Sequence, residues 1–395
     1  MLGLTRYIYD TNKIVLCTIF LVFFTGDNVC NTFGVNLPIY KFLLLILCAF
    51  SITKLGRLYY TQPQVICLLL FCFLYMGFKI STGGQAGNIM MGLTVILPVF
   101  IYILYSTLEQ DYNAWLYKKV LYIAYLLECG VALVERVLHT HIFLWNPDST
   151  SDILEFEVSE FRSYGLYGHP LQNAVVILVF ILFILVYERN VKWKFSLSLL
   201  GILAILCFNT RAAIVISSLS LVLYVFYWLS TERISDGIKM MTFVSLIILA
   251  GSVYYLYSLG LIGGRLSSMG LYDENSAAVR VDALNIFKYY DITDFMFGIS
   301  LNDTLLLKSR LGLVAVENFW LNWMLGYGIV FVIGLVFFYF PVIKGVLYNN
   351  SLFEKCFLFY PFIILASTNP SLAVSIVPMT AFLLLSYIMP KSNLN

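Results

Sequence analysis

Charged residues are the first thing that this chain lacks. Only 12% of its 395 residues are charged and 61% are hydrophobic, with a mean hydropathy of +0.87, whereas soluble domains carry about 25% charged residues. The composition excludes a soluble domain and indicates an all-α polytopic membrane protein, with one integral membrane domain over residues 1–395. The net charge of +2 is too small to favour nucleic acid as a partner, so the lipid bilayer is the expected one.

Paired cysteines and clustered histidines are also missing. The eight cysteines form no CxxC pair, have no histidine at metal spacing and lie nearly all within apolar runs. We therefore expect buried thiols that behave as small hydrophobic side chains, with no disulfide, no metal site and no cofactor.

Neither a cleavage site nor an internal repeat is visible. The first apolar run follows Arg6 and Lys13 as a signal peptide would, but no small-residue cleavage site comes after it. We expect a retained helix there. The lack of a repeat disfavours transporter folds that are built from paired halves.

Long apolar runs are abundant. A run of about 17–25 residues crosses a bilayer as a helix. Ten to twelve spans are expected, because some runs are of marginal length and 195–230 is also readable as one broken hairpin. The about twelve candidates centre on 14–25, 39–55, 64–79, 89–107, 119–138, 171–187, 195–210, 211–230, 239–259, 317–340, 352–367 and 370–389.

Basic residues predict which loops face which side, because cytoplasmic loops hold most of the Lys and Arg. With the N-terminus inside, the short outer connections carry little beyond Lys41, Lys79 and Arg211. The cytoplasmic segments then carry Arg6, Lys13, Lys54, Arg57, Lys118, Lys119, Arg189, Lys192, Lys194, Arg233, Lys239, Lys344, Lys355 and Lys391. Both termini are expected in the cytoplasm, and the long loops 139–170 and 260–316 on the outer side, where we expect the functional site.

Loop 139–170 contains an acidic run followed by a polar cluster. The acidic residues Asp148, Asp152, Glu155, Glu157 and Glu160 are typical of a solvated face, and a divalent-cation site is the alternative. The cluster that follows contains Arg162, Gly165, Gly168, His169, Pro170 and Asn173. His169 is a candidate general base, but His-Pro is equally a way to start a helix.

Arginines recur on the predicted outer side, where few are expected. They are Arg162, Arg211, Arg265, Arg280 and Arg310. The guanidinium fork matches phosphate oxygens, so these residues predict a phosphate or pyrophosphate clamp at the membrane surface. Arg211 stands between two apolar runs, where burying a charge is costly unless it is paired or has a function. The alternative is a side chain that snorkels to the membrane interface.

Loop 260–316 is too long for a simple connection. Val279, Ala283, Ile286, Phe287 and Tyr290 recur on one face of 276–290. This periodicity predicts a short amphipathic helix on the outer surface, with Arg280 and Asp282 on its polar face and Asn275 or Ser276 as its N-cap.

Acidic and aromatic residues mark two further places. Glu317 opens the span 317–340, and the helix dipole favours a carboxylate in the first turn, so capping alone could explain it. Asn318 and Trp320 beside it predict a polar and aromatic ledge on which sugar rings could stack. Glu128 and Glu135 share one face of the span 119–138, and carboxylates within a membrane span are functional by default. For Glu135 the alternative is an interfacial pair with Arg136.

The order of these elements resembles the bacterial O-antigen polymerase and O-antigen ligase superfamily. The resemblance rests on the Arg162–Asn173 cluster, on Thr210-Arg211, on the spaced Arg265 and Arg280, and on Glu317-Asn318-Phe319 with Leu321 and Gly328. These motifs lie between about 160 and 330, and each is short and degenerate. The resemblance implies a GT-C-like fold and a glycosyltransferase that polymerises undecaprenyl-pyrophosphate-linked repeat units, for O-antigen or capsule, on the periplasmic side of the inner membrane. A chain-length regulator and a flippase would be its partners.

The resemblance also implies roles for individual residues. Arg211, Arg280 and Arg162, with Arg265, would stabilise the leaving pyrophosphate, and Asn318 and Trp320 would contact the sugar. Glu317 or His169 would act as the base, and no metal is implied. Ligases of this superfamily typically carry a histidine where this chain has Glu317, which favours a polymerase.

Other functions stay open at this stage. A ligase is the second interpretation, and a flippase for lipid-linked sugars is the third, since it too needs arginines for the pyrophosphate. A flippase should place its charges in a central cavity, whereas here they concentrate in outer loops and helix ends. A structural scaffold has no reason to keep Arg211 between apolar runs.

Overall fold

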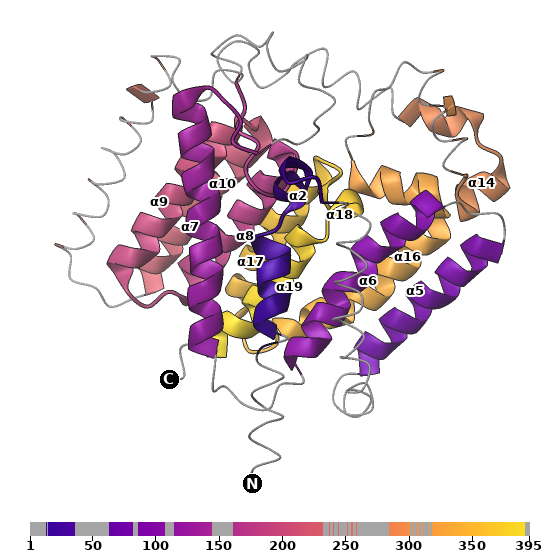
Figure 1. Ribbon diagram of the computed structural model, residues 1–395. Coiled ribbons are helices and arrows are strands. Elements are labelled where there is room, and N and C mark those ends of the chain that lie inside the picture. Colours follow the sequence, from indigo (N-terminus) through magenta and orange to yellow (C-terminus); the bar gives the residue numbers. More distant parts are fainter. Residues whose placement is uncertain are drawn as a thin grey trace.

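The computed structural model shows an assembly of helices (Figure 1). It describes residues 15–35, 63–81, 86–106, 114–143, 161–231, 284–300 and 318–391 together with isolated positions between them, and for 86–93 the backbone alone. The described helices are 15–23, α2 (Asp27–Thr32), α5 (Pro63–Ser81), α6 (Ala86–Ser106), α7 (Ala114–Leu138), α8 (Pro170–Tyr187), α9 (Val191–Phe208), α10 (Arg211–Thr231), η5 (Asn285–Tyr289), α14 (Ile292–Phe297), α16 (Phe319–Val346), α17 (Leu352–Ser367), α18 (Ser371–Val374) and α19 (Val377–Lys391). The described part of the chain contains no strand.

Several helices have the length and composition of membrane spans. Within the described residues, 5 helices qualify, namely α5, α8, α9, α10 and α16, and shorter apolar helices run over Thr94–Ser106 and Val377–Pro390. The chain is therefore a multi-pass membrane protein. The expected total of about twelve spans stays a prediction. The run 39–55 lies wholly outside the described residues, and most of the run 239–259 does too.

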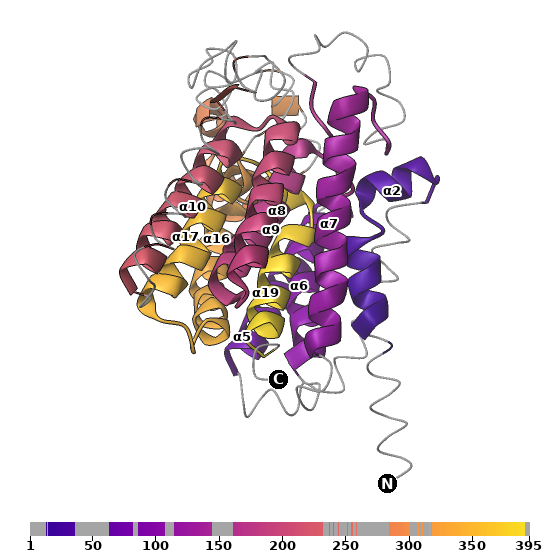
Figure 2. The ribbon, with the colours of Figure 1, turned by 90° about the vertical axis from the view of Figure 1, so that its left-hand side faces the viewer.

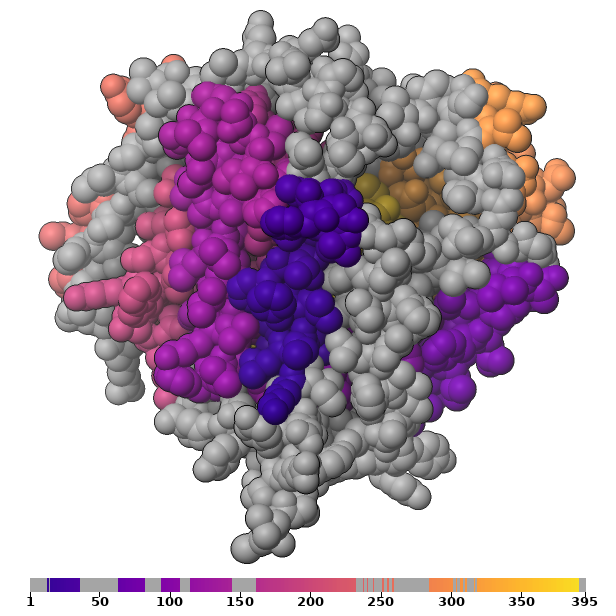
Figure 3. Space-filling view, in the orientation of Figure 1, coloured from indigo at the N-terminus to yellow at the C-terminus, as the bar shows by residue number. Residues whose placement is uncertain are grey.

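Helix α8 forms the centre of the bundle. It packs against α7, α9, α10, α17 and α19, and its residues from Ala174 to Leu185 are at most 1% exposed. A helix that is apolar on every side belongs inside a bundle rather than against lipid. Figures 1 and 2 show the surrounding helices running alongside α8, and Figure 3 shows α2 and helix 15–23 beside α7 on the surface.

One end of the bundle gathers several of the described residues that the sequence predictions single out, among them Arg162, His169 and Arg211. Helices α7 and α9 end there, and α8, α10 and α16 begin there, at the top of Figure 1. We call this the motif end. The hairpin of α9 and α10 turns there at Asn209, which is left-handed at φ 52, and Thr210.

Helix α16 is broken at Gly328, where the backbone adopts φ 83 and ψ 172. The carbonyl groups freed by the break find other donors, since Ile299 N donates to Leu325 O over 2.8 Å and the Tyr75 hydroxyl donates to Tyr327 O. Such replacement partners allow a break at membrane depth. The chain of α14 approaches so closely that a Cβ at Gly328 would lie 2.2 Å from Met296 O.

Two predicted elements differ in the structure. The run 370–389 forms α18 and α19 instead of a single helix. The chain leaves the helix at Ser375, which is extended at φ −126 and ψ 140, and Pro378 has no N–H for the carbonyl of Val374. In the predicted helix 276–290, the described part is the short 3-10 helix η5, with Ile286 only 1% exposed; Val279, Ala283 and their neighbours lie outside the described residues.

Gly328→Ala should destabilise the protein by about 2–5 kcal/mol, because alanine tolerates the positive φ poorly and its methyl group collides with Met296 O. The control is Gly77→Ala in α5, where a Cβ meets nothing within 4 Å, so alanine should be neutral or stabilise by up to about 1 kcal/mol. The thermal unfolding of both purified variants measures the difference. Equal unfolding temperatures would contradict the tight packing of α14 on the break.

Candidate functional site

The polar cluster predicted from the sequence forms a compact loop at the motif end. We call residues 161–169 the polar segment. It lies among the end of α7, the short helix α2, the end of α9 and the start of α8, in the upper part of Figure 2. Most of it is buried: Ser163 is 0% and Tyr167 1% exposed.

The carboxylates of α7 hold the backbone of this segment. Glu135 Oε2 accepts from Tyr164 N over 2.7 Å and from Gly165 N over 3.1 Å, while its Oε1 accepts from Ile142 N over 2.9 Å. Glu128 Oε2 accepts from Leu166 N over 2.9 Å. Both side chains are 0% exposed. Hydrogen bonds from backbone N–H groups are what make a buried carboxylate tolerable, so these residues position the segment.

Two asparagines bind the opposite edge of the segment. Asn28 Nδ2 in α2 donates to the carbonyls of Tyr164, Gly165 and Gly168 over 3.1, 2.9 and 2.9 Å. Asn173 in α8 accepts from Tyr167 N over 3.0 Å and donates to the carbonyl of Tyr164. The carboxylates accept from N–H groups of the segment, and the two amides bind its carbonyls and the N–H of Tyr167, which leaves little freedom to the loop.

Gly165 is required by this geometry. Its φ is +61, and a Cβ there would lie 2.1 Å from Glu128 Oε1. A larger residue would both strain the backbone and displace the carboxylate.

The polar segment also ties two predicted arginines to one turn. Ser163 N donates to Cys207 O over 3.1 Å, and Arg162 Nε donates to Phe208 O over 3.3 Å. Arg211 begins α10 three residues later. Both arginines are partly exposed, and a helix N-terminus attracts anions by its dipole and its N–H groups. This turn is therefore chemically suited to a phosphate group.

His169 starts α8. It is the N-cap, its Nδ1 accepts from Leu171 N over 3.2 Å, and Pro170 follows as the first helical residue. This confirms the helix-start interpretation of His-Pro. A neutral imidazole that accepts at Nδ1 carries its proton on Nε2, so His169 in this arrangement is suited to donate a hydrogen bond and is less suited to accept a proton.

His141 lies in an aromatic stack at the edge of the site. Its ring stacks on Phe161 at a centroid distance of 4.8 Å and on Tyr164 at 4.0 Å. Burial lowers the pKa of His141 to about 4, because the charged form loses its hydration there. The imidazole is neutral at physiological pH and contributes as an aromatic ring.

Asn318 and Trp320 occupy another part of the motif end. Asn318 is the N-cap of α16 and accepts from Trp320 N and Leu321 N over 2.8 and 3.2 Å. Trp320 Nε1 donates to Ser367 Oγ over 2.9 Å. The Trp320 ring lines an apolar cavity of about 290 Å³ together with Trp323 and other side chains of α6, α16, α17 and α19. The indole is anchored and faces an apolar space, which differs from the open ledge expected.

Other predicted residues are not placed. Glu317, Arg265 and Arg280 lie outside the described residues, as does most of loop 260–316. Arg310 is described, and it lines a different cavity at the end of α5. Within the described part of the chain, no group of three or more His, Cys, Asp or Glu could hold a metal ion.

Sequence reasoning missed Asn28. It lies in a short helix without a recognisable motif, and its contacts reach residues 136 to 140 positions further along the chain. A polar residue directly after an apolar run was the available signal. Glu128 and Glu135 stand out in the sequence as carboxylates within an apolar run, but their backbone partners could not be foreseen from one helix.

Glu135→Ala should lower stability by several kcal/mol, because the amides of Tyr164, Gly165 and Ile142 lose their acceptor at about 1–3 kcal/mol for each buried group. Glu135→Gln keeps one acceptor oxygen and should lie between this variant and wild type. The control is Glu354→Ala, which removes an exposed capping box at the other end of the bundle and should cost about 1 kcal/mol. Thermal unfolding ranks the three; a loss for Glu135→Ala no larger than for the control would contradict the role of Glu135.

Stability should fall as pH falls from about 6.5 towards 4, in part because of His141. Its folded pKa of about 4 lies below the ordinary value near 6.5, so the unfolded chain takes up the proton first and acid favours unfolding. His141→Phe keeps a stacking ring and removes the titration. The unfolding temperature of this variant should therefore drop less between pH 7.5 and 5.0 than that of wild type, and an equal drop would contradict the burial of His141.

Comparison with known proteins agrees with the motifs. The chain matches no protein-family profile. It is 25% identical over 373 residues to a protein of Shigella flexneri named O-antigen polymerase, and the match covers 88% of this chain and 84% of that protein. The chain is thus a distant homologue of an O-antigen polymerase.

Proposed function

We propose that this protein is an oligosaccharide repeat-unit polymerase, a glycosyltransferase whose donor is a glycan on undecaprenyl pyrophosphate. The observation that carries the proposal is the similarity to an O-antigen polymerase along 88% of the chain. The convergence of Arg162 and Arg211 on the α9–α10 turn supports it independently.

The reaction joins an acceptor sugar to the donor glycan. A hydroxyl oxygen of a lipid-linked repeat unit attacks the anomeric carbon of the growing chain, the bond from that carbon to the pyrophosphate oxygen breaks, and undecaprenyl pyrophosphate leaves with the electron pair. The hydroxyl proton passes to a base. In this proposal the described residues act mainly by stabilising the leaving group, on which negative charge develops.

Arginines at the α9–α10 turn provide the stabilisation in this proposal. Arg211 and Arg162 bind the pyrophosphate oxygens beside the N-terminus of α10, and Arg280 and Arg265 of the long loop complete the clamp. Fixed donors at a site without bulk water stabilise developing charge better than water does. The polar segment holds Arg162 in place through Glu135, Asn28 and Ser163.

The base is assigned to Glu317. His169 accepts a hydrogen bond at Nδ1, so its other nitrogen serves better as a donor to the glycan or to a phosphate oxygen. Asn318 and Trp320, next to Glu317 in the sequence, contact the sugar in this proposal.

The site faces the periplasm, with both chain termini in the cytoplasm, as the distribution of basic residues predicts. The product is O-antigen or capsule.

Two other functions give different cellular outcomes. A ligase would transfer finished polymer from its lipid carrier, and its loss would leave intact polymer on that carrier. A flippase would move repeat units outward, and its loss would trap them on the cytoplasmic face. The motifs of this chain and the name of its relative favour the polymerase over both.

Arg211→Ala should abolish the ladder of polymer lengths and cause single repeat units to accumulate, because losing one charged donor to the leaving group typically costs about 10²-fold or more in rate. Arg211→Lys keeps the charge without the fork and should restore part of the ladder. Gel separation of lipid-linked and surface glycans from complemented deletion cells measures both.

The matched control is Arg189→Ala, an exposed arginine at the opposite end of the bundle, which should leave the ladder unchanged. Membrane levels of all variants are compared on the same samples. A normal ladder from Arg211→Ala at wild-type protein level would contradict the proposed pyrophosphate clamp. An unchanged ladder in the deletion strain itself would contradict the polymerase function.

A further inference from the structure

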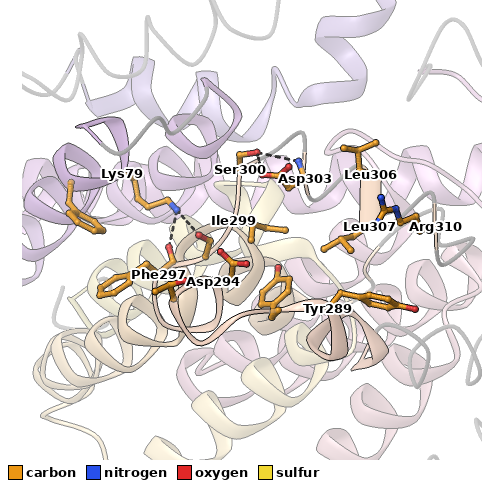
Figure 4. A pocket seen from close by; sticks show the side chains of 14 residues that line it. Lys79, Tyr289, Asp294, Phe297, Ile299, Ser300, Asp303, Leu306, Leu307 and Arg310 are labelled. Carbon is orange, nitrogen blue, oxygen red and sulfur yellow. Dashed lines mark hydrogen bonds between the residues drawn. The ribbon is translucent and has the colours of Figure 1, made fainter.

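A second cavity, separate from the apolar one beside Trp320, lies at the motif end, away from the α9–α10 turn, and it is polar. Its volume is about 560 Å³, and it is lined by the end of α5, by α14 and by residues up to Arg310 (Figure 4). Cavities of about 300–1,000 Å³ are the usual size for small-molecule sites. The clamp proposed above does not use this cavity, and the lining residues of the cavity come from two separate parts of the chain, the end of α5 and residues 289–310.

One wall of the cavity is held rigid. Lys79 is 7% exposed, and its Nζ donates to Phe297 O over 2.8 Å and to Gly298 O over 3.2 Å. The next residue, Ile299, donates its N–H to Leu325 O of α16. The wall is thus pinned to α5 on one side and to the broken helix on the other. A preformed wall of this kind is what a specific binding site needs, because little order is lost on binding.

The charges of the cavity are balanced. Its described lining includes the cations Lys79 and Arg310 and the carboxylates Asp294 and Asp303. Figure 4 shows Lys79 near one side and Arg310 at the other, with Ile299 between them. The Lys79 ammonium is already engaged by two carbonyl oxygens. A pyrophosphate would therefore meet as many carboxylates as cations, and the cavity is poorly suited to an anion.

Hydroxyl groups and carboxylates supply the polar contacts. Asp303 Oδ2 accepts from Ser300 Oγ over 2.6 Å, and its N–H donates to the same hydroxyl over 3.2 Å, which fixes the carboxylate in place. A carboxylate has lone pairs for several donors at once, so Asp303 and Asp294 can each accept from more than one hydroxyl of a ligand. The ligand that this favours is uncharged and rich in hydroxyl groups.

Aromatic rings supply the apolar contacts. Phe78, Tyr289, Tyr290 and Phe297 line the same cavity. Tyr289 is 58% exposed, so its ring offers an open face. The hydroxyl oxygen of Tyr290 is buried and has no hydrogen-bond partner among the described residues, which is a costly state unless a ligand supplies one. A sugar ring combines apolar C–H faces with hydroxyl groups at its edge, and it matches both kinds of contact.

We propose that this cavity is a subsite for an uncharged sugar residue of the lipid-linked glycan. The proposal rests on the polymerase function, which makes a glycan the substrate. The sugar stacks on Tyr289, and its hydroxyls donate to Asp294 and Asp303 and bond the Tyr290 hydroxyl. The cavity thus binds one sugar of the glycan at a distance from the pyrophosphate clamp. Lys79 acts as a positioning residue, because it holds the backbone of Phe297 and Gly298 in the cavity wall.

Binding is tested on the purified full-length protein in lipid nanodiscs. The probe is the free repeat-unit oligosaccharide, released by mild acid from the lipid-linked glycans of the strain that carries this gene, and saturation-transfer NMR follows its binding. Asp294→Asn, Asp303→Asn and Tyr290→Phe should each weaken binding about tenfold or more, since each removes a charge or a hydroxyl from a sugar contact. Variants that bind the oligosaccharide as tightly as wild type would overturn the subsite.

The controls separate specific loss from misfolding and from anion binding. Glu354→Gln removes a carboxylate at the other end of the bundle and should bind as wild type does. Every variant must unfold within a few degrees of wild type, and Asp303, which is exposed, is the safest of the substitutions. Inorganic pyrophosphate at the concentration of the oligosaccharide should not displace it; displacement would mean that the cavity is an anion site and the proposal is wrong.

The subsite and the polymerase can fail separately. If wild type restores the polymer ladder but binds no oligosaccharide, the subsite is refuted and the polymerase stands. Conversely, if deletion of the gene leaves the polymer ladder intact, the polymerase function is refuted. If wild type then still binds the oligosaccharide and Asp303→Asn does not, the sugar-binding subsite stands without it. Arg211→Ala should bind the oligosaccharide normally while making no polymer, which would support both.

Discussion

The motif end depends on one interaction, the capture of backbone N–H groups by carboxylates inside α7. Glu135 and Glu128 accept from Tyr164, Gly165 and Leu166, and this fixes a loop that would otherwise have unpaired amides inside the protein. The other contacts of the segment follow from its fixed path. Asn28 can reach three carbonyls and Arg162 can reach α9 because the backbone between them is held.

The same loop connects elements that are distant in sequence. The polar segment joins α2, α7, α8 and the end of α9, so the start of the central helix and the α9–α10 turn are positioned by one piece of chain. The break in α16 plays the corresponding role on the other side. There the freed carbonyls of Leu325 and Tyr327 accept from Ile299, just after α14, and from Tyr75 of α5, which shapes the second cavity.

The sequence allowed the helices to be predicted where the signal is local. Run length and hydropathy predict α5, α8, α9, α10 and α17 within a few residues, and His-Pro predicts the start of α8. The break at Gly328 could not be predicted, because a glycine is tolerated within a helix and its partner, Met296, lies on a separate element. The split of 370–389 has a local signal in Pro378, but hydropathy alone does not reveal it.

The candidate site was predictable in kind but not in arrangement. Motif order singles out Arg162, His169 and Arg211, yet the contact of Arg162 with Phe208 spans 46 residues and depends on the fold. The lining of the second cavity had even less local signal, since Lys79, Asp294 and Arg310 come from segments that resemble ordinary helix ends and loops. Their common location follows only from how α14 docks into the break.

The buried carboxylates have a consequence for how the protein enters the membrane. Helix α7 is synthesised before residues 164–166, so Glu128 and Glu135 leave the ribosome before the N–H groups that will bind them exist. A membrane span with lone carboxylates is costly to release into lipid. If α7 spans the membrane, as the apolar run 119–138 predicts, its release from the insertion machinery is therefore favoured once the polar segment and α8 have followed.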